Sequence, residues 1–500
     1  MGLKENRTSK VYLVGAGPGD PGLLTLRGRA LLEIADVVIY DYLADSSLLG
    51  YVRSNCVLID VGKRPNRPMP QSEINTILAD SCSTYEHVVR LKGGDPMLFG
   101  RGGEELIALE SLGVPYEVVP GVSSALAVPT YAGIPVTHRG VSTSLTVITG
   151  HRQGGASDDT NYHALVQLGG TLVVLMGVEH RAKIASQLIA AGMDPKTLVA
   201  AIRWGTRLDQ ITVRGQLDVL AELDVRSPSV IVIGDVAGFN FNFFESRPLF
   251  GKSVVVTRGE TQQKGFSSKL ADLGAKVVLA PTIEIAPPSD SYELLDNCIK
   301  DLALFDLLIF TSINAVLGFF SRLDDLRVLG HLKIVAVGTS TAEAIAKYRI
   351  GVDIIPDSFV AESLIDALPN ANGARVLIPR SEIARDVLPD GLRSKGYDVV
   401  TAPTYTTKRY VDTQLDPNTL READAVCFTS SSTAKNFVES YGLESLPSLV
   451  ISIGPITSQT LRALGVSDIS EAKVHDLDGL LRALVEAVAR KDAHYEPGRN

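Results

Sequence analysis

Short apolar runs alternate with amphipathic stretches through the first 240 residues. The runs near 11–14, 36–41, 58–63, 88–89 and 114–119 have the length and β-branched content of buried strands, and a helix is predicted over 25–35. Further strands are predicted at 145–149, 171–176, 198–203 and 230–234, separated by helical stretches. This order predicts two successive α/β layers, with ligands binding where strands end.

The segment from Arg90 to Glu104 is the most distinctive loop of the chain. It follows an apolar strand and carries glycines at 93, 94, 100, 102 and 103, which let the backbone turn tightly and approach a ligand. Asp95 adds a fixed acceptor beside backbone amides, and Pro96 disfavours an immediate helix. The segment predicts a site for a small ligand with hydroxyl and amine donors; an ordinary glycine-rich turn is the alternative.

An earlier glycine loop, residues 15–22, suggests a dinucleotide fold. The third glycine of that fingerprint is replaced by Asp20, and Pro18 and Pro21 interrupt the helix start on which a pyrophosphate would lie. A nicotinamide oxidoreductase is therefore disfavoured. Asp41 and Lys63 each end a predicted strand, where polar side chains from several strands would gather at one sheet edge.

An internal repeat marks the second half, beyond a Phe- and Asn-rich linker near 239–248. Residues 254–258, 310–312 and 337–341 reappear in the same order at 376–380, 428–430 and 453–457. Two homologous α/β lobes are expected, with a cleft between them. The β-prone runs 280–285 and 402–407 are predicted to connect the lobes, so that the last third of the chain completes the first lobe.

The composition limits the kinds of partner and the cellular compartment that we expect for this protein. The 500 residues are 45% apolar and 21% charged, with a net charge of −9, which argues against a nucleic-acid partner. The four cysteines form no CxxC pair, so neither a metal site nor a disulfide framework is predicted. No apolar run reaches the length of a membrane span and the start lacks an apolar leader, so we expect a cytoplasmic protein without membrane partners.

Seven ordered motifs give the first half a specific resemblance. VxLVGAGPGDPxLLTLRG, ADVVxYD, VGKR, PQxEIN, RLKGGDPxxFGRGGEE, VVPGVSSAxAVPxYAGIPVTHRG and TGH occur between about Val11 and Gly238. They resemble the uroporphyrinogen-III C-methyltransferases of the tetrapyrrole methylase family. The resemblance implies S-adenosylmethionine (SAM) bound between two α/β domains, and a homodimer formed through this half.

Site residues follow from the same resemblance. The implied proton-transfer pair is Asp41 and Lys63. The implied SAM contacts are Pro18, Gly93, Gly94, Asp95, Leu98, Ser123, Ser124, Met176 and Gly205. Basic residues beside the motifs are candidates to pair with the carboxylates of a tetrapyrrole, with surface charge as the alternative: Arg64, Arg67, Arg101, His138 and Arg139.

The second half, from Lys252 to about Ala489, resembles uroporphyrinogen-III synthase through VTR, FTSxNAV, VGxxTA, FTSSS and IGPxT. That family closes hydroxymethylbilane into a ring without cofactor or metal. Tyr405, Ser430 and Thr457 fall on its catalytic positions, and Thr311 and Ser312 are the counterparts in the other lobe, where substrate would bind. For Ser312 and Ser430 a second reading stays open, because Ser or Thr after a strand often caps the next helix.

The resemblances together predict a bifunctional enzyme that makes uroporphyrinogen III and methylates it twice, at C2 and C7, to precorrin-2, toward sirohaem and cobalamin. The expected fold is a two-domain methylase followed by a two-lobe synthase whose lobes are joined by two strands. The alternatives are a methylase acting on a later corrin intermediate or on diphthine, and a non-catalytic, ligand-binding second half. The expected domains are 8–140 and 141–240, a linker 241–250, one lobe from 251–283 plus 407–490, and the other from 284–406.

Overall fold

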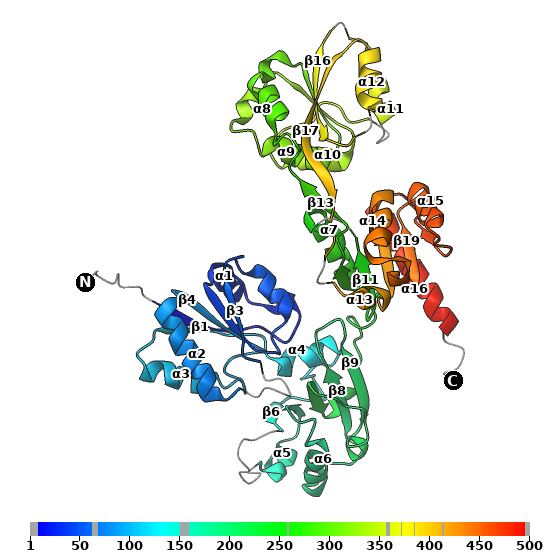
Figure 1. Ribbon diagram of the computed structural model, residues 1–500. Coiled ribbons are helices and arrows are strands. Elements are labelled where there is room, and N and C mark those ends of the chain that lie inside the picture. The colour runs from blue at the N-terminus through cyan, green and yellow to red at the C-terminus, as the bar shows by residue number, and fades with distance from the viewer. Residues whose placement is uncertain are drawn as a thin grey trace, which may run out of the picture. The chain divides into compact units, whose positions relative to one another are not determined.

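A computed structural model describes residues 9–62, 69–150, 160–257, 260–356, 361–371, 373–384, 386–412 and 415–495 (Figure 1). The chain divides into two compact units. One contains the residues up to 252 together with 272–276, and the other contains the rest. Within the described ranges, no helix has the length and apolar character needed to cross a membrane.

The first sheet is parallel, with strand order β3-β2-β4-β1-β5. Its strands are β1 (Lys10–Gly15), β2 (Val37–Tyr40), β3 (Val57–Asp60), β4 (His87–Lys92) and β5 (Tyr116–Val119). Helices α1 (Leu26–Ile34), α2 (Gln71–Thr84) and α3 (Gly102–Ser111) accompany it. The predicted helix over 25–35 is confirmed, and the Thr25 hydroxyl caps it by accepting a hydrogen bond from the amide of Gly28.

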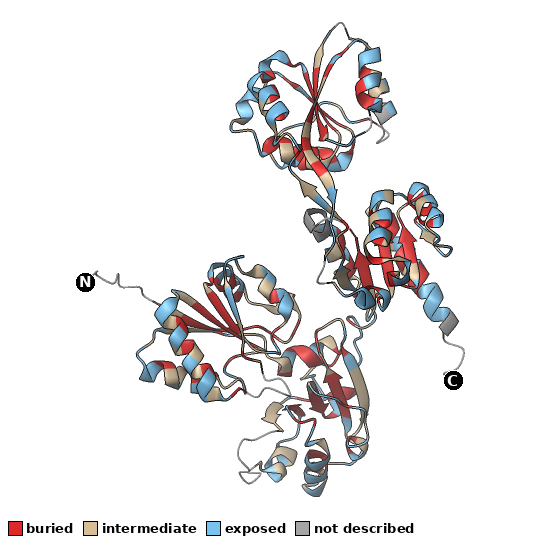
Figure 2. Ribbon diagram, viewed as in Figure 1, coloured by how far each residue is buried: buried red, intermediate tan, exposed pale blue. Residues whose placement is uncertain are grey.

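Strand alternation assigns the helices to the two faces of this sheet. Tyr12 and Val14 of β1 share a buried cluster with leucines of α1, whereas Val11 and Leu13 pack against side chains of α2 and α3. Both faces are covered, and the strands form the buried centre of the domain (Figure 2). A ligand site is therefore expected at the ends of the strands.

The second sheet is mixed, with order β6-β7-β10-β8-β9. Its strands are β6 (Leu145–Thr149), β7 (Thr171–Leu175), β8 (Leu198–Arg203), β9 (Ile211–Gln216) and β10 (Ser229–Ile233), and its helices are α5 (Tyr162–Leu168) and α6 (Arg181–Ala190). β10 runs antiparallel to β7 and β8, and β8 antiparallel to β9. The sequence pattern missed β9, because its residues are half-buried or exposed and do not alternate between buried and exposed positions. The helix predicted between β8 and β10 is wrong, because β9 lies there instead.

Helix α4 (Ser124–Tyr131) follows β5 of the first sheet but packs on the second. Its buried Ala125 and Val128 belong to the same apolar cluster as Val173 of β7 and Ile202 of β8. The helix therefore links the end of one sheet to the face of the other. The predicted domain boundary at residue 140 stays a prediction, as do the other domain limits.

One lobe of the second unit has the sheet order β12-β11-β18-β19-β20. Its strands are β11 (Ser253–Val256), β12 (Lys276–Leu279), β18 (Ala425–Phe428), β19 (Leu449–Ser452) and β20 (Ser470–Glu471). Its helices are α7 (Glu260–Asp272), α13 (Pro417–Arg421), α14 (Ser431–Tyr441), α15 (Pro455–Ala463) and α16 (Leu477–Tyr495). β11 pairs directly with β18, so segments about 170 residues apart complete one sheet.

The other lobe has the order β13-β17-β16-β14-β15. Its strands are β13 (Ile283–Ala286), β14 (Leu307–Phe310), β15 (Lys333–Ala336), β16 (Arg375–Ser381) and β17 (Asp398–Arg409), with helices α8 (Glu293–Lys300), α9 (Ile313–Phe320), α10 (Thr339–Ala346), α11 (Ala361–Ala367) and α12 (Val387–Ser394). β13 and the end of β17 pair antiparallel where the chain enters and leaves this lobe. The predicted two-strand connection is confirmed.

Candidate functional site

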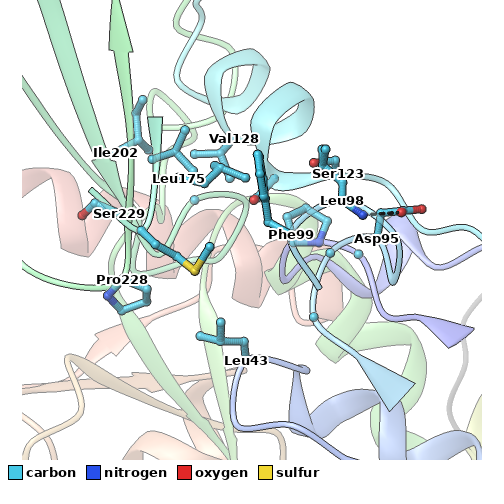
Figure 3. Close-up of a pocket in the computed structure, with 18 of the residues that line it drawn as sticks. Leu43, Asp95, Leu98, Phe99, Ser123, Val128, Leu175, Ile202, Pro228 and Ser229 are labelled. Carbon is cyan, nitrogen blue, oxygen red and sulfur yellow. Dashed lines mark hydrogen bonds between the residues drawn. The ribbon is translucent and has the colours of Figure 1, made fainter. Parts of the chain in front are cut away.

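A cavity lies in the first unit between its two sheets, where the strands of the first sheet end (Figure 3). Its volume is about 890 Å³ when the open mouth is counted. The loops after β1, β2, β4 and β5 form one wall, and the ends of β7 and β8 with the start of β10 form the other. The nine residues expected to contact SAM all line this cavity: Pro18, Gly93, Gly94, Asp95, Leu98, Ser123, Ser124, Met176 and Gly205.

In the glycine loops, main-chain atoms approach one another without intervening side chains. Gly94 has φ +68° and exchanges two backbone hydrogen bonds with Gly17, at 2.7 and 3.2 Å. A Cβ on Gly121 would lie 2.2 Å from the carbonyl oxygen of Gly94. A side chain at Gly121 would therefore separate the loops, whereas at Gly94 the left-handed backbone favours glycine.

Asp95 fastens two of these loops together. One carboxylate oxygen accepts hydrogen bonds from the amides of Met97 and Leu98, at 2.8 and 3.1 Å, and the other accepts from the amide of Gly121 at 3.0 Å. Figure 3 shows this side chain beside the cavity. Its carboxylate, which the sequence suggested as a ligand acceptor, orders the glycine loops.

Left-handed backbone recurs around the cavity. Phe99, Met176 and Trp204 have φ of 53°, 54° and 48°, although none is glycine. Met176 directly follows β7 and Trp204 directly follows β8. Such conformations persist only where surrounding structure enforces them and are concentrated at functional sites. Each turns the chain sharply, so that residues just beyond a strand line the cavity.

Arg207 connects the two walls. Its guanidinium lies 4.7 Å from the centroid of the Trp204 ring and forms a 2.7 Å ion pair with Asp45 from the first sheet's side. Burial alone would raise the pKa of Asp45, but hydrogen bonds from Ser47 and the charge of Arg207 outweigh it and hold this pKa below its ordinary value. The ion pair therefore links the two walls of the cavity.

Asp41 lies just beyond β2, two residues before Leu43 of the cavity wall. Its carboxylate receives a 2.6 Å hydrogen bond from Arg90, and its side chain is 28% exposed. Arg90 and Lys92 of β4 both contact Glu105 of α3. Burial lowers the pKa of Lys92, repulsion from Arg90 adds to this effect, and Glu105 and Asp41 oppose it.

The basic candidates do not gather in the cavity. Arg101, at the start of α3, forms two hydrogen bonds with Glu104, and the ring of His138 lies 4.6 Å from that of Phe239. Arg139 is exposed. None of these three side chains lines the cavity. Lys63, Arg64 and Arg67 lie outside the described residues.

In the second unit, Ser312 and Tyr405 are brought together, with their hydroxyl oxygens 3.3 Å apart. Ser312 also caps α9 by accepting a hydrogen bond from the amide of Ala315, and Ser430 caps α14 in the same way from Thr433. The capping alternative thus describes both serines. Of the other two candidates, Thr311 is half-buried before α9, and Thr457 is buried in α15.

Sequence reasoning missed several residues of the cavity and its surroundings. Leu43, Phe99, Trp204, Arg207 and Pro228 line the cavity without having been predicted. Trp204 adjoins the predicted Gly205, but its left-handed backbone cannot be read from its residue type. The ion pairs of Arg90 were missed because Arg90 was assigned to the glycine loop, whereas it lies within β4, which extends to Lys92.

A parallel sheet with a glycine-lined cavity at its strand ends, together with a two-lobed α/β unit, is the architecture of a small-molecule enzyme. Residues 10–221 match the family model of the tetrapyrrole (corrin/porphyrin) methylases, and residues 264–482 match that of uroporphyrinogen-III synthase HemD. A porphyrin biosynthesis protein HemD from Ruminiclostridium josui is 36% identical over 496 residues, covering 95% of this chain and 97% of that protein.

Two further relatives match the first half. A uroporphyrinogen-III C-methyltransferase from Synechocystis is 43% identical over 256 residues, or 50% of this chain and 97% of that protein. A crystal structure of a uroporphyrin-III C-methyl transferase from Thermus thermophilus, complexed with S-adenyl homocysteine, is 40% identical with a TM-score of 0.41, covering 46% of this chain and 94% of that one.

The chain belongs to the tetrapyrrole methylases over its first half and to the uroporphyrinogen-III synthases over its second. The predicted fusion and fold class are thereby confirmed. A SAM-dependent methyltransferase domain precedes a synthase domain, and both belong to tetrapyrrole biosynthesis.

Proposed function

We propose that the second unit closes hydroxymethylbilane to uroporphyrinogen III, and that the first unit methylates this product twice, at C2 and C7, to precorrin-2. The observation that carries the methylase assignment is the single cavity lined by all nine residues expected to contact SAM. Membership of the whole chain in the two families supports the pairing of activities. The product would serve sirohaem and cobalamin formation.

The lining of the cavity suits SAM in its chemistry. Its lining includes apolar side chains such as Leu98, Val128 and Ile202, beside exposed main chain at Gly93 and Gly94. A folded nucleoside with an amino-acid tail needs apolar walls for its base and backbone groups for its polar atoms. When bound, SAM supplies an electrophilic methyl group. The protein contributes alignment, which can be worth roughly 7 to 11 kcal/mol in such displacements.

Asp41 is the proposed base at the pyrrole. A pyrrole carbon becomes more nucleophilic as the ring N–H loses its proton, and a carboxylate such as Asp41 can accept that proton. One oxygen of Asp41 is held by Arg90, and the other accepts no hydrogen bond from the residues that the structure describes. Lys63 is the proposed partner of Asp41 in proton transfer. The basic residues beside the motifs remain candidates for the substrate's carboxylates.

The hydroxyl pair of Tyr405 and Ser312 is the proposed centre of the synthase unit, with Ser430, Thr457 and Thr311 as further candidates. The Tyr405 hydroxyl can donate a hydrogen bond to the hydroxyl group that leaves hydroxymethylbilane, while Ser312 orients that phenol. Ring closure of this kind needs positioning and a proton donor, and we propose that it proceeds without cofactor or metal.

We propose in addition a cytoplasmic homodimer formed through the first unit, as the family resemblance implies. Sedimentation of the full chain tests this: a mass near 107 kDa, twice the 53.5 kDa of one chain, is expected. A species that stays at the monomer mass at micromolar concentration would contradict it.

The methylase assignment is tested with the full chain, uroporphyrinogen III and methyl-labelled SAM. The wild type should transfer two methyl groups per macrocycle. Asp41→Asn should bind SAM with nearly unchanged affinity but transfer methyl groups at least about tenfold more slowly, because it removes a base and leaves the cavity intact. Unaltered turnover in Asp41→Asn would refute the proposed role of Asp41.

A further inference from the structure

A buried charge network lies beneath the proposed base. Arg90 and Lys92 occupy alternate positions of β4 and face the side of the sheet covered by α2 and α3. The side chains of Arg90, Lys92 and Glu105 are only 2%, 4% and 0% exposed. Charged side chains are rarely buried so completely unless they are paired, and burying them is unfavourable even then. Such a network calls for a reason other than stability.

The guanidinium of Arg90 is fixed from several directions. It donates to Asp41 Oδ1 at 2.6 Å, to Glu105 Oε1 at 3.2 Å, and to the carbonyl oxygens of Ile39 and Leu91 at 3.3 and 3.2 Å. These partners come from β2, from β4 itself and from α3. A planar group with this many partners has one possible orientation.

Glu105 holds the far side of Arg90. Its Oε1 also accepts hydrogen bonds from Lys92 at 2.8 Å and from Gln71 at 3.1 Å. Its buried Oε2 has no hydrogen-bond partner among the residues that the structure describes. Two cations thus face two carboxylates, Glu105 and Asp41. Of these four side chains, Asp41 alone reaches solvent, at 28% exposure.

We propose that Arg90, held by Glu105, is a positioning residue that fixes the Asp41 carboxylate just beyond β2, with one oxygen held by Arg90 and the other left to accept a proton from the substrate. The inference rests on the proposed function, since it assigns Asp41 the role of base. This role accounts for the burial of two cations and a carboxylate in an apolar layer. Apolar side chains of similar size could be buried there at a lower cost in free energy.

A double-mutant cycle on the full chain tests the inference. Arg90→Lys keeps the charge but has one nitrogen for four partners, so kcat for methyl transfer should fall at least about tenfold while the Kd for SAM changes less than about threefold. In an Asp41→Asn background the same substitution should change kcat less than about threefold, because the carboxylate it positions is already gone. Glu105→Gln should behave in the same way with a smaller loss, and it carries the cycle if Arg90→Lys does not fold.

Arg53→Lys is the matched control. Arg53 also binds a carboxylate, Asp36 at 2.9 Å, and the carbonyl oxygens of Ile34 and Ala35, but at the opposite end of β2. It should leave kcat unchanged. Equal losses from Arg90→Lys with and without the Asp41 carboxylate would overturn the inference, since a merely structural role gives additive effects. Absence of methyl transfer in the wild type would instead refute the proposed function, and this inference with it.

Discussion

Replacing Gly205 by alanine should weaken SAM binding through a single steric contact. A Cβ at Gly205 would lie 2.2 and 2.6 Å from the two methyl carbons of Val128. Val128 is 3% exposed and lies in α4, where a β-branched side chain has one strongly preferred rotamer. The neighbours Trp204 and Thr206 already have φ of 48° and 71°, so the loop has little freedom to move. The wall of the cavity must therefore shift.

The size of the effect follows from the overpacking. Inserting a methyl group into a packed site typically costs about 1 to 3 kcal/mol. Because α4 is packed against the second sheet, relief of this strain displaces the wall of the cavity, and a ligand must reverse that displacement. The same energy then appears in the affinity, as a roughly 5- to 150-fold increase in Kd.

Calorimetric titration of S-adenosylhomocysteine into the full chain measures this Kd. Gly205→Ala should bind weakly, and adding Val128→Ala should restore part of the affinity, because it removes the two closest methyl groups and leaves only the Val128 Cβ, 2.8 Å from the new methyl carbon. Gly103→Ala is the control: a Cβ there meets nothing within 4 Å, and alanine should leave binding unchanged. An unaltered Kd in Gly205→Ala, or no rescue by Val128→Ala, would show that this wall does not border the ligand.

Three further outcomes are expected. Asp45→Asn should lower the free energy of unfolding at pH 7 by about 1 kcal/mol. Because the folded-state pKa of Asp45 is depressed, this stabilisation is present above the ordinary pKa of 3.8 and is lost as the pH falls through the lower folded-state pKa. Urea titrations of the two proteins should therefore converge in acid, and a difference that stays constant with pH would contradict this. Tyr405→Phe should slow type III ring closure about 10- to 100-fold without changing methyl transfer to added uroporphyrinogen III, and an unchanged rate would remove the Tyr405–Ser312 pair from the mechanism. Cys427 should resist thiol reagents until its lobe unfolds, because burial raises its pKa to about 12, and rapid labelling of native protein would contradict its burial in β18.

Much of the fold could be predicted from the sequence because apolar runs and glycine loops report local structure directly. Strand β9 could not, because its half-buried residues give no alternation and Gly215 weakens its strand propensity. The direction of β10 between β7 and β8 depends on tertiary pairing, which no local pattern records.

The candidate site was predictable where motifs fix the backbone and not where side chains meet across the fold. The loops with Gly94 and Gly205 were found because glycine is required there. Arg207 pairs with Asp45 across 162 residues, and Arg90 pairs with Asp41 across 49, so neither contact leaves a local signal. Ser430 caps α14 and also contacts the hydroxyls of Ser432 and Thr433.

The most direct test of the two linked activities is one coupled reaction of the full chain with hydroxymethylbilane and methyl-labelled SAM. The product should carry two labelled methyl groups on a type III macrocycle, and without SAM the reaction should stop at uroporphyrinogen III. Recovery of only the spontaneous type I isomer, with no label incorporated, would contradict both halves of the proposal.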